Sequence, residues 1–183
     1  MTPVSDAVPR YDRISIWLHW LTAALVILLW CLGQTIDWFP KGAPRIAARS
    51  LHICAGAALG VLLLYRIWWR SAAGARLPAA SAGIPQLLAK TVHWLLYLTL
   101  VATVALGLFN TWVRGDNLFG LVKIAAFDPG NKVLRNNVED FHALAANVLL
   151  ALAAAHAAAA LLHHYYWKDQ VLRRMLPASR QGD

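Results

Sequence analysis

Four long apolar stretches, separated by polar segments, dominate the pattern of the chain. They run from about Ile14 to Ile36, Ile46 to Trp69, Leu87 to Phe109 and Phe141 to Trp167. A helix needs roughly 20 residues to cross a hydrocarbon core of about 30 Å, so each stretch is long enough to span a membrane. The pattern predicts an all-α fold, an integral membrane four-helix bundle that forms a single domain over residues 1–183.

Composition supports the membrane assignment. Hydrophobic residues make up 59% of the chain and charged residues only 14%, and the mean hydropathy of +0.49 exceeds that of an ordinary soluble domain. The first apolar stretch is too long for the core of a signal peptide and has no convincing small-residue cleavage site. We therefore expect it to be retained as the first helix.

Basic residues set the expected orientation. The side that carries both termini has ten Lys or Arg residues and four acids, and the other side has seven and five, so the net charge of +8 divides into about +6 and about +2. The positive-inside rule then places both termini in the cytoplasm. Anionic lipid accounts for most of the basic character, and no basic stripe indicates binding to nucleic acid.

The two longer connections have different characters. Residues 71–85, SAAGARLPAASAGIP, are rich in small residues, Gly and Pro, and are predicted to be a flexible cytoplasmic link. Residues 110–140 are predicted to form a long periplasmic loop. Within it, LFGLVKIAAF predicts a short amphipathic helix at the outer membrane surface, and a loop that only joins two helices is the alternative.

Cysteine contributes little to the candidate chemistry. Cys31 and Cys54 both fall inside apolar stretches, and the chain has no CxxCH or CxxC motif. This excludes covalent c-type haem and a zinc ribbon. We expect two buried thiols that behave as small hydrophobic side chains, rather than a disulfide.

Histidine spacing supplies the candidate chemistry. His142 and His156 lie fourteen residues apart in the fourth stretch. A helix places them within roughly 40° of one another around its axis and about 21 Å apart along it. Because a titratable side chain in hydrocarbon is costly, such a pair indicates a functional site.

Depth in the membrane sorts the remaining histidines. With the N-terminus inside, His52 shares the outer level with His142, while His19 and His93 share the inner level with His156. Two histidines at one level match the axial ligands of a b-type haem, which a four-helix bundle can hold between its helices. A zinc or copper cluster would need three or four ligands converging at one level.

The inner level has three candidates for two positions. We prefer His19 with His156, because the fourth helix then serves both haems from one face, and His93 remains the alternative. Small residues in the helices would let a flat macrocycle approach the backbone. These are Gly33, Gly56 and Gly107.

Several segments together resemble the bacterial cytochrome b561 family. They are RISIWLHW, SLHICAG, VHWLLYLTL, EDFHALAANVLLALAAAHAAAALLHHYYWKD and RRMLP, and the resemblance runs from about Tyr11 to Pro177. It implies a bacterial inner-membrane protein with two b-type haems. The haem iron ligands that it implies are His19, His52, His142 and His156.

The resemblance also implies an activity. The expected reaction is oxidation of superoxide at the periplasmic face, with electrons passing through the outer and inner haems to ubiquinone. Basic residues of the outer face would steer the superoxide anion, and the candidates for contact with it are Arg49, Lys132 and Arg135. The alternative is that some of the basic residues bind haem propionates, lipid headgroups or the nearby acids. The full basic set is Lys41, Arg45, Arg49, Arg114, Lys123, Lys132 and Arg135.

Candidate contacts also lie on the cytoplasmic side. Arg66 and Arg70 are candidates for binding the propionates of the inner haem, and the alternative for Arg66 is that it extends its charged end to the membrane surface. A quinone headgroup is expected near His163 and Trp167, beside His19.

Two other functions remain to be compared. An electron-transfer subunit would link a periplasmic dehydrogenase or hydrogenase to the quinone pool, but no obligatory protein partner is evident from the sequence. A metal transporter would place acids or methionines along a pore. No acid lies well inside an apolar stretch, and Met1 and Met175 are the only methionines, so a transporter is disfavoured.

Overall fold

Four long helices make up most of the computed structural model, which describes residues 9–177. They are α1 (Arg13–Thr35), α2 (Ala43–Ala72), α3 (Ile84–Arg114) and α4 (Lys132–Tyr165). The connections hold the 3-10 helices η1 (Ile36–Trp38) and η2 (Leu172–Met175) and the strands β1 (Asn117–Leu118) and β2 (Val122–Lys123). All four long helices are apolar and long enough to cross a membrane, which confirms the predicted fold class. Three residues of the charge balance, Asp6, Arg180 and Asp183, lie outside the described range.

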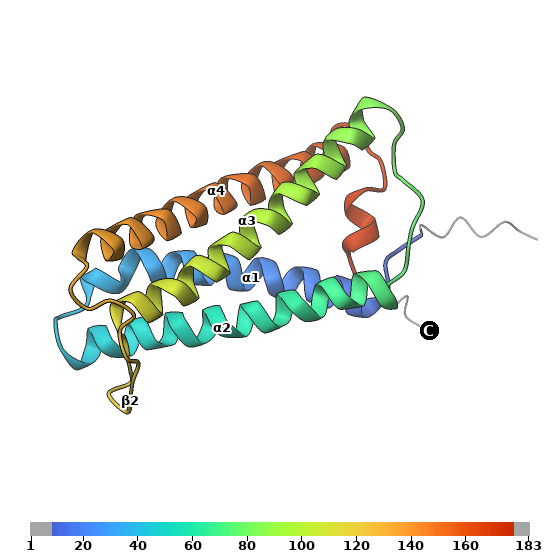
Figure 1. Ribbon diagram of the computed structural model, residues 1–183. Coiled ribbons are helices and arrows are strands. Elements are labelled where there is room, and N and C mark those ends of the chain that lie inside the picture. Colours follow the sequence, from blue (N-terminus) through green and yellow to red (C-terminus); the bar gives the residue numbers. More distant parts are fainter. Residues whose placement is uncertain (1–8, 178–183) are drawn as a thin grey trace, which may run out of the picture.

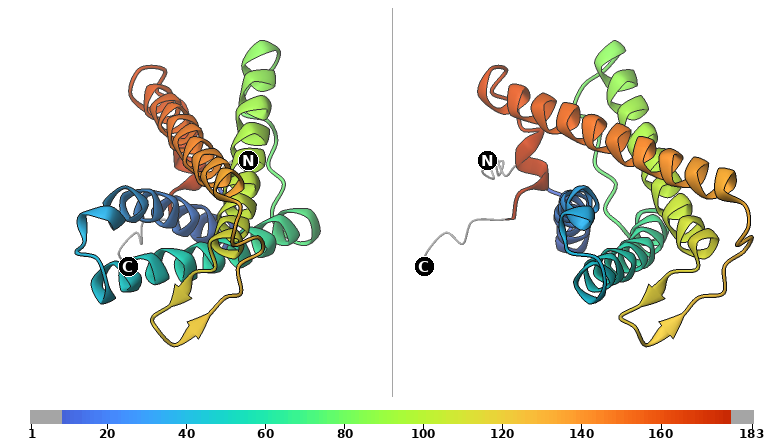
Figure 2. Two further views of the ribbon diagram at one scale, coloured as in Figure 1. Left: turned by 60° about the vertical axis from the view of Figure 1, so that its left-hand side comes forward. Right: turned by 90° about the vertical axis from the view of Figure 1, so that its left-hand side faces the viewer.

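The helices form two antiparallel pairs. In Figure 1, α1 and α2 lie side by side, and α3 and α4 form a second pair inclined to the first. We call the end with η1 and the strands the outer end, and the end with residues 9 and 177 the inner end. In both Figure 1 and Figure 2, α3 is close to α2 at the outer end and diverges from it toward the inner end. That the inner end faces the cytoplasm stays a prediction from charge.

Leucines from all four helices make the central contact of the bundle. Where α2 meets α3, Gly60 permits the approach, because a Cβ there would lie 3.1 Å from Val104 Cγ1. Many other large apolar side chains are exposed on the outside of the bundle, as a lipid-facing surface requires. The buried leucines of the core are Leu29, Leu59, Leu63, Leu100 and Leu149.

α2 and α3 extend at both ends, and α4 at its start, beyond the apolar stretches that predicted them. α3 begins at Ile84, directly after Gly83, and ends at Arg114, where Gly115 caps it in the left-handed conformation (φ 65°). α4 begins at Lys132 because the side chain of Asn131 accepts a hydrogen bond from Leu134 N and caps the helix. The outer connection is therefore shorter than the predicted loop of residues 110–140.

The prediction of an amphipathic helix in the outer connection is wrong. β1 and β2 pair antiparallel there, with Leu118 opposite Val122. Phe119 and Gly120 turn the chain with positive φ angles of 53° and 77°, which a helix does not allow. Ser50 in α2 favours this hairpin over a helix, because it binds the turn. Its fully buried hydroxyl accepts a hydrogen bond from Phe119 N (2.8 Å) and donates to Ile46 O (2.7 Å).

The cysteine prediction is half wrong. Cys31 and Cys54 are free thiols, as expected, but both side chains are exposed on the outside of the helices rather than buried. In a membrane that surface faces lipid, where a thiol still behaves as a small apolar side chain.

Asp12 joins the inner ends of α1 and α2. Its carboxylate accepts hydrogen bonds from Ser15 N (2.9 Å), Ser15 Oγ (2.7 Å), Trp69 Nε1 (3.1 Å) and Ala75 N (3.0 Å). Partial burial of the carboxyl group opposes its ionisation, but the hydrogen bonds outweigh this and lower the pKa of Asp12 from 3.8 to about 2. The carboxylate caps α1 and holds the start of the link after α2.

Replacing Asp12 by Ala should therefore destabilise the protein. The loss of a helix cap costs about 1 kcal/mol, and the additional bonds to α2 should bring the cost to about 2 kcal/mol. Asp12→Asn keeps one acceptor oxygen and should lose less. Thermal unfolding of the purified protein in detergent measures the difference.

The same comparison has a defined pH dependence. Because folding lowers the pKa of Asp12, its stabilisation is complete above the ordinary value of 3.8 and disappears as the pH falls through about 2. The difference in unfolding temperature between wild type and Asp12→Ala should shrink over that range. An equal difference at neutral pH and at about pH 2 would contradict the assigned role.

Candidate functional site

Two histidines face each other at the outer level of the bundle. The ring centres of His52 (α2) and His142 (α4) are 6.2 Å apart, with the ring planes at 89°. Two imidazoles that bind one metal ion from opposite sides, each through a bond of about 2 Å, hold their ring centres roughly 6 Å apart. The pair therefore has the separation that one shared metal ion requires.

Each outer histidine has a ring nitrogen that is available to bind a metal ion. The Nδ1 of His142 lies 3.0 Å from the carbonyl oxygen of Thr103. A carbonyl only accepts, so Nδ1 must carry the proton and the lone pair of Nε2 is available to a metal. The Nδ1 of His52 is buried without a hydrogen-bond partner among the described residues. Both side chains thus fit the role of axial ligand.

A cavity of about 230 Å³, which we call the slot, lies between the four helices at this level and is lined by His52 and His142. A Cβ on Gly107 would lie 2.9 Å from Cε1 of His142, and one on Gly33 would lie 3.3 Å from Cε1 of His52. Gly56 also lines the slot and has open space where a side chain would begin. The predicted glycines thus border the space beside the two imidazoles.

Three histidines meet at the inner level. The ring centres of His19 (α1) and His156 (α4) are 6.3 Å apart, close to the separation of the outer pair. The ring centre of His93 (α3) is only 5.4 Å from that of His156. This is shorter than the separation of roughly 6 Å that two imidazoles sharing one metal ion require. Within residues 9–177, no three His, Cys, Asp or Glu side chains converge closely enough to hold a bare metal ion.

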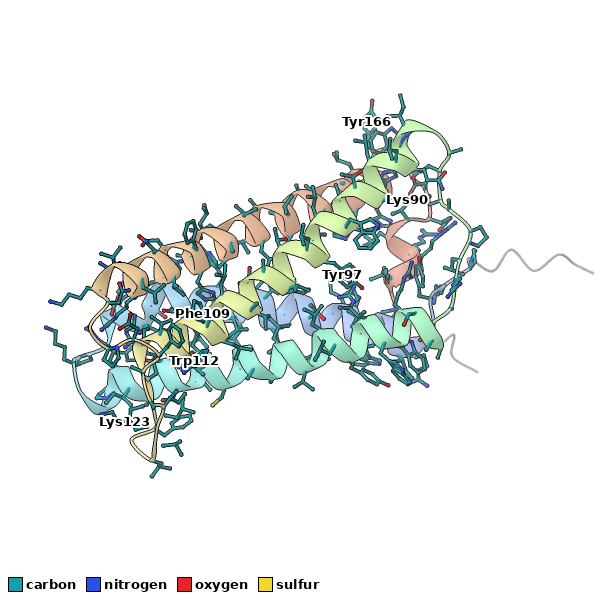
Figure 3. All side chains as sticks on the ribbon, in the orientation of Figure 1. Lys90, Tyr97, Phe109, Trp112, Lys123 and Tyr166 are labelled. Carbon is teal, nitrogen blue, oxygen red and sulfur yellow. The ribbon has the colours of Figure 1, made fainter. Side chains whose placement is uncertain are left out.

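The two inner arginines have different surroundings. Nη2 of Arg66 lies 3.1 Å from Nδ1 of His19, and its guanidinium lies over the ring of Tyr97 at 5.5 Å. Figure 3 shows Tyr97 extending from α3 toward α2. Arg70 instead lies over the ring of Tyr11, at 5.6 Å. The structure therefore brings Arg66, and not Arg70, into contact with a predicted ligand.

The predicted quinone contacts are partly brought together. His163 and Trp167 have ring centres 4.6 Å apart, with Trp167 just beyond the end of α4. His19 contacts Trp20 and His156 instead. A residue that the sequence did not single out, Asp169, accepts a hydrogen bond from Nδ1 of His163. Burial would raise the pKa of Asp169, but the bonds from His163 and from Val171 N lower it below its ordinary value.

A second cavity opens outward from the slot. This vestibule, of about 420 Å³, is lined by Arg49 and Arg135 but not by Lys132. Its other charged lining residues are Asp37, Lys41, Arg45, Arg114 and Glu139. Four residues line both cavities, and we call them the neck: Asp37, Arg49, Arg114 and Glu139.

Ion pairs connect the elements around the neck. Arg114 (α3) pairs with Glu139 (α4) and lies 3.5 Å from Oδ1 of Asp116, which is also 3.8 Å from Nη1 of Arg49 (α2). Burial raises the pKa of Asp116, although both arginines favour its ionised form. Of the four neck residues, Arg49 and Arg114 belong to the basic outer face predicted from the sequence, whereas Asp37 and Glu139 were not predicted as site residues. Only the position of Glu139, one turn before His142, was a signal for them.

Comparison with known proteins identifies the family of the chain. The chain matches the family described as "Prokaryotic cytochrome b561" over residues 10–178. It is 33% identical over 175 residues to "Probable superoxide oxidase CybB" of Yersinia pestis, covering 93% of this chain and 98% of the relative. "Cytochrome b561 homolog 1" of Escherichia coli (strain K12) is 32% identical over 172 residues, covering 92% and 97%. "Cytochrome b562" of Cereibacter sphaeroides is 32% identical over 173 residues, covering 92% and 96%.

These matches extend over almost the whole chain and over almost the whole length of each relative. They accompany four membrane-spanning helices and histidines paired across the helices, which are the features that a membrane-embedded b-type haem requires. The chain therefore belongs to the prokaryotic cytochrome b561 family, and is a multi-pass membrane cytochrome that carries b-type haem and transfers electrons.

Proposed function

We propose that the protein holds two haem b groups, one at each histidine level, and uses them to carry electrons across the bacterial inner membrane. His52 and His142 are the proposed ligands at the outer level, and His19 and His156 at the inner level. The observation that carries this proposal is the agreement between the two ring separations, 6.2 Å and 6.3 Å. The 5.4 Å separation of His93 from His156 favours His19 as the inner ligand.

The spacing on α4 connects the two levels. His142 and His156 lie on one face of a continuous helix, with backbones about 21 Å apart along its axis. Haem, when bound, supplies one-electron oxidation and reduction. Helix α4 fixes one ligand of each level, so its rigidity sets the distance between them.

Superoxide is the proposed electron donor at the outer end. Five positive and three negative side chains surround the vestibule and neck when Asp116 is included, which leaves a net charge of about +2. Arg49 and Arg135 line the vestibule, and Lys132 adds its charge from the first turn of α4. Such a field attracts a small anion. The name of the Yersinia pestis relative supports the same donor.

Ubiquinone is the proposed acceptor at the inner end. Two superoxide ions give up two electrons and leave as dioxygen, and one quinone takes these two electrons with two protons to become quinol. Near the inner end, His163 holds a proton on Nδ1 toward Asp169 and packs against Trp167 with the ring planes tilted by 54°. These groups suit a quinone headgroup that must receive protons. Arg66, beside His19, is the proposed partner for haem carboxylates, and Arg70, which lies over the ring of Tyr11, is the second candidate.

Orientation completes the proposal. The excess of basic residues at the inner end favours a cytoplasmic position for both termini. The vestibule then opens to the periplasm, and electrons move from the periplasmic face to the quinone pool.

The direct test mixes purified, haem-loaded protein in nanodiscs with ubiquinone and a superoxide source. We expect superoxide to disappear with one quinol formed for each two superoxide ions, and without the hydrogen peroxide that dismutation gives. Arg49→Gln combined with Arg135→Gln should slow the reaction about tenfold at low ionic strength. If superoxide decays no faster than with haem-free protein and the haems stay oxidised, the proposed donor is wrong.

Replacing His142 by Leu tests the ligand assignment. The substitution removes one ligand of the outer level and leaves His19 and His156 in place, so one haem should be lost and the other retained with its spectrum unchanged. Haem content per chain and the reduced-minus-oxidised spectrum measure this. Retention of both haems would refute the assignment, and His93→Leu, which should keep both, is the matched control.

Replacing Gly107 by Ala tests the approach to His142. The new Cβ would lie 2.9 Å from Cε1 of the imidazole, so the ring must move. We expect the haem signal that His142→Leu removes to be weakened or lost. Alanine favours a helix over glycine by roughly 1 kcal/mol, so helix destabilisation is not the cause. Gly130→Ala, in open space outside the helices, is the control, and an unchanged outer signal in Gly107→Ala would contradict the expectation.

A further inference from the structure

The ion pair between Arg114 and Glu139 lies in the neck, where the vestibule meets the slot. Its two members differ in exposure: the Arg114 side chain is 9% exposed, whereas that of Glu139 is 50% exposed. Arg114 is held on α3 and Glu139 on α4, so the pair closes the neck between two helices. Any molecule that passes from the vestibule to the slot meets this pair.

Arg114 has unused capacity to bind an anion. A guanidinium carries five N–H donors. Nη1 of Arg114 donates to Glu139, while the buried Nε has no hydrogen-bond partner among residues 9–177. Oδ1 of Asp116 is 3.5 Å from this Nε, too far for a well-formed hydrogen bond. A buried donor without an acceptor is unfavourable, so an anion that enters the neck gains a hydrogen bond that the resting pair does not make.

The difference in exposure determines which partner can move. Glu139 is long, flexible and half in water, so its carboxylate can turn into the vestibule at little cost. Arg114 is enclosed and cannot follow. The Asp116 side chain, 10% exposed, cannot leave either. Its carboxylate lies beside both Arg114 and Arg49 and holds them in position. The neck therefore opens by movement of Glu139 alone.

Only an anion can replace the displaced carboxylate. A neutral or cationic molecule that pushes Glu139 aside leaves the buried Arg114 to share the single carboxylate of Asp116 with Arg49, and one unbalanced positive charge in a buried cluster is unfavourable. A small anion restores the charge balance and can also reach Nε. The charge of the entering molecule thus decides whether opening is favourable.

We propose that Arg114 is the anion-binding residue of the neck and that Glu139 is a displaceable carboxylate that makes entry from the vestibule into the neck selective for small monoanions. The inference rests on the proposed function in one respect, that a redox centre lies at the outer level behind the neck. It does not require that superoxide be the natural donor. Arg114 binds the anion directly, and Glu139 acts through Arg114.

The test compares charged reductants with two variants in the haem-loaded protein. Dithionite supplies the sulfur dioxide radical anion, a one-electron monoanion, and hexaammineruthenium(II) is a one-electron cation. Glu139→Gln removes the charge and keeps the shape. Asp140→Asn removes the same charge from the next residue, which lines neither cavity. Stopped-flow absorbance follows haem reduction by each reductant at low and high salt.

We expect Glu139→Gln to accelerate reduction by the radical anion about three- to tenfold at low salt, a size typical of local charge effects on association. Asp140→Asn should change it less than about twofold, because its effect is only through net charge. Reduction by the ruthenium cation should not be accelerated in either variant. Adding Arg114→Gln to Glu139→Gln should abolish the gain.

Three results would overturn the proposal. Glu139→Gln could leave the radical-anion rate unchanged, or Asp140→Asn could give an equal gain, or Arg114→Gln could lower the haem content, which would assign Arg114 to a carboxylate of the cofactor. The superoxide assay separates this proposal from the previous one. If wild-type protein ignores superoxide but Glu139→Gln still selects for the radical anion, the donor is wrong and the neck assignment stands.

Discussion

Imidazole pairing across helices in an apolar interior is the interaction on which the rest of this structure depends. Each of two levels brings a histidine of α4 to within 6.2 or 6.3 Å, ring centre to ring centre, of a histidine on α2 or α1. A polar ring is costly in hydrocarbon unless it is bound, so these positions require a partner. A metal held between the rings satisfies both at once. The four-helix arrangement, with small residues beside the rings, supplies the space.

Charge is arranged so as to complement these two levels. At the outer end, arginines from α2, α3 and α4 surround a vestibule, and carboxylates between them keep the buried guanidinium groups paired. At the inner end, Asp12 and the pair of His163 with Asp169 hold the ends of helices and connecting segments together. The apolar middle carries leucines from every helix. An anionic donor at one end and a proton-requiring acceptor at the other fit this division.

The four membrane spans and the outer histidine pair could be predicted from helix periodicity and from the length of the apolar stretches. Four spans followed from hydropathy, and the contact of His52 with His142 followed from depth and orientation alone. The helix ends were harder to predict, because α4 starts at Lys132, capped by Asn131, nine residues before the apolar stretch begins at Phe141. The hairpin at β1 and β2 depends on Ser50, a distant residue whose hydroxyl binds Phe119 N, so local pattern favoured a helix wrongly. The neck pair joins residues 25 positions apart, and no local signal connects them.

Two bis-histidine haems per chain can be detected in a single set of measurements on the oxidised protein. These are haem quantification and low-temperature electron paramagnetic resonance. Two imidazole ligands at each level predict two haem b per chain, both low-spin and six-coordinate. A single haem per chain, or a high-spin signal from either centre, would contradict the pairing of His52 with His142 or of His19 with His156.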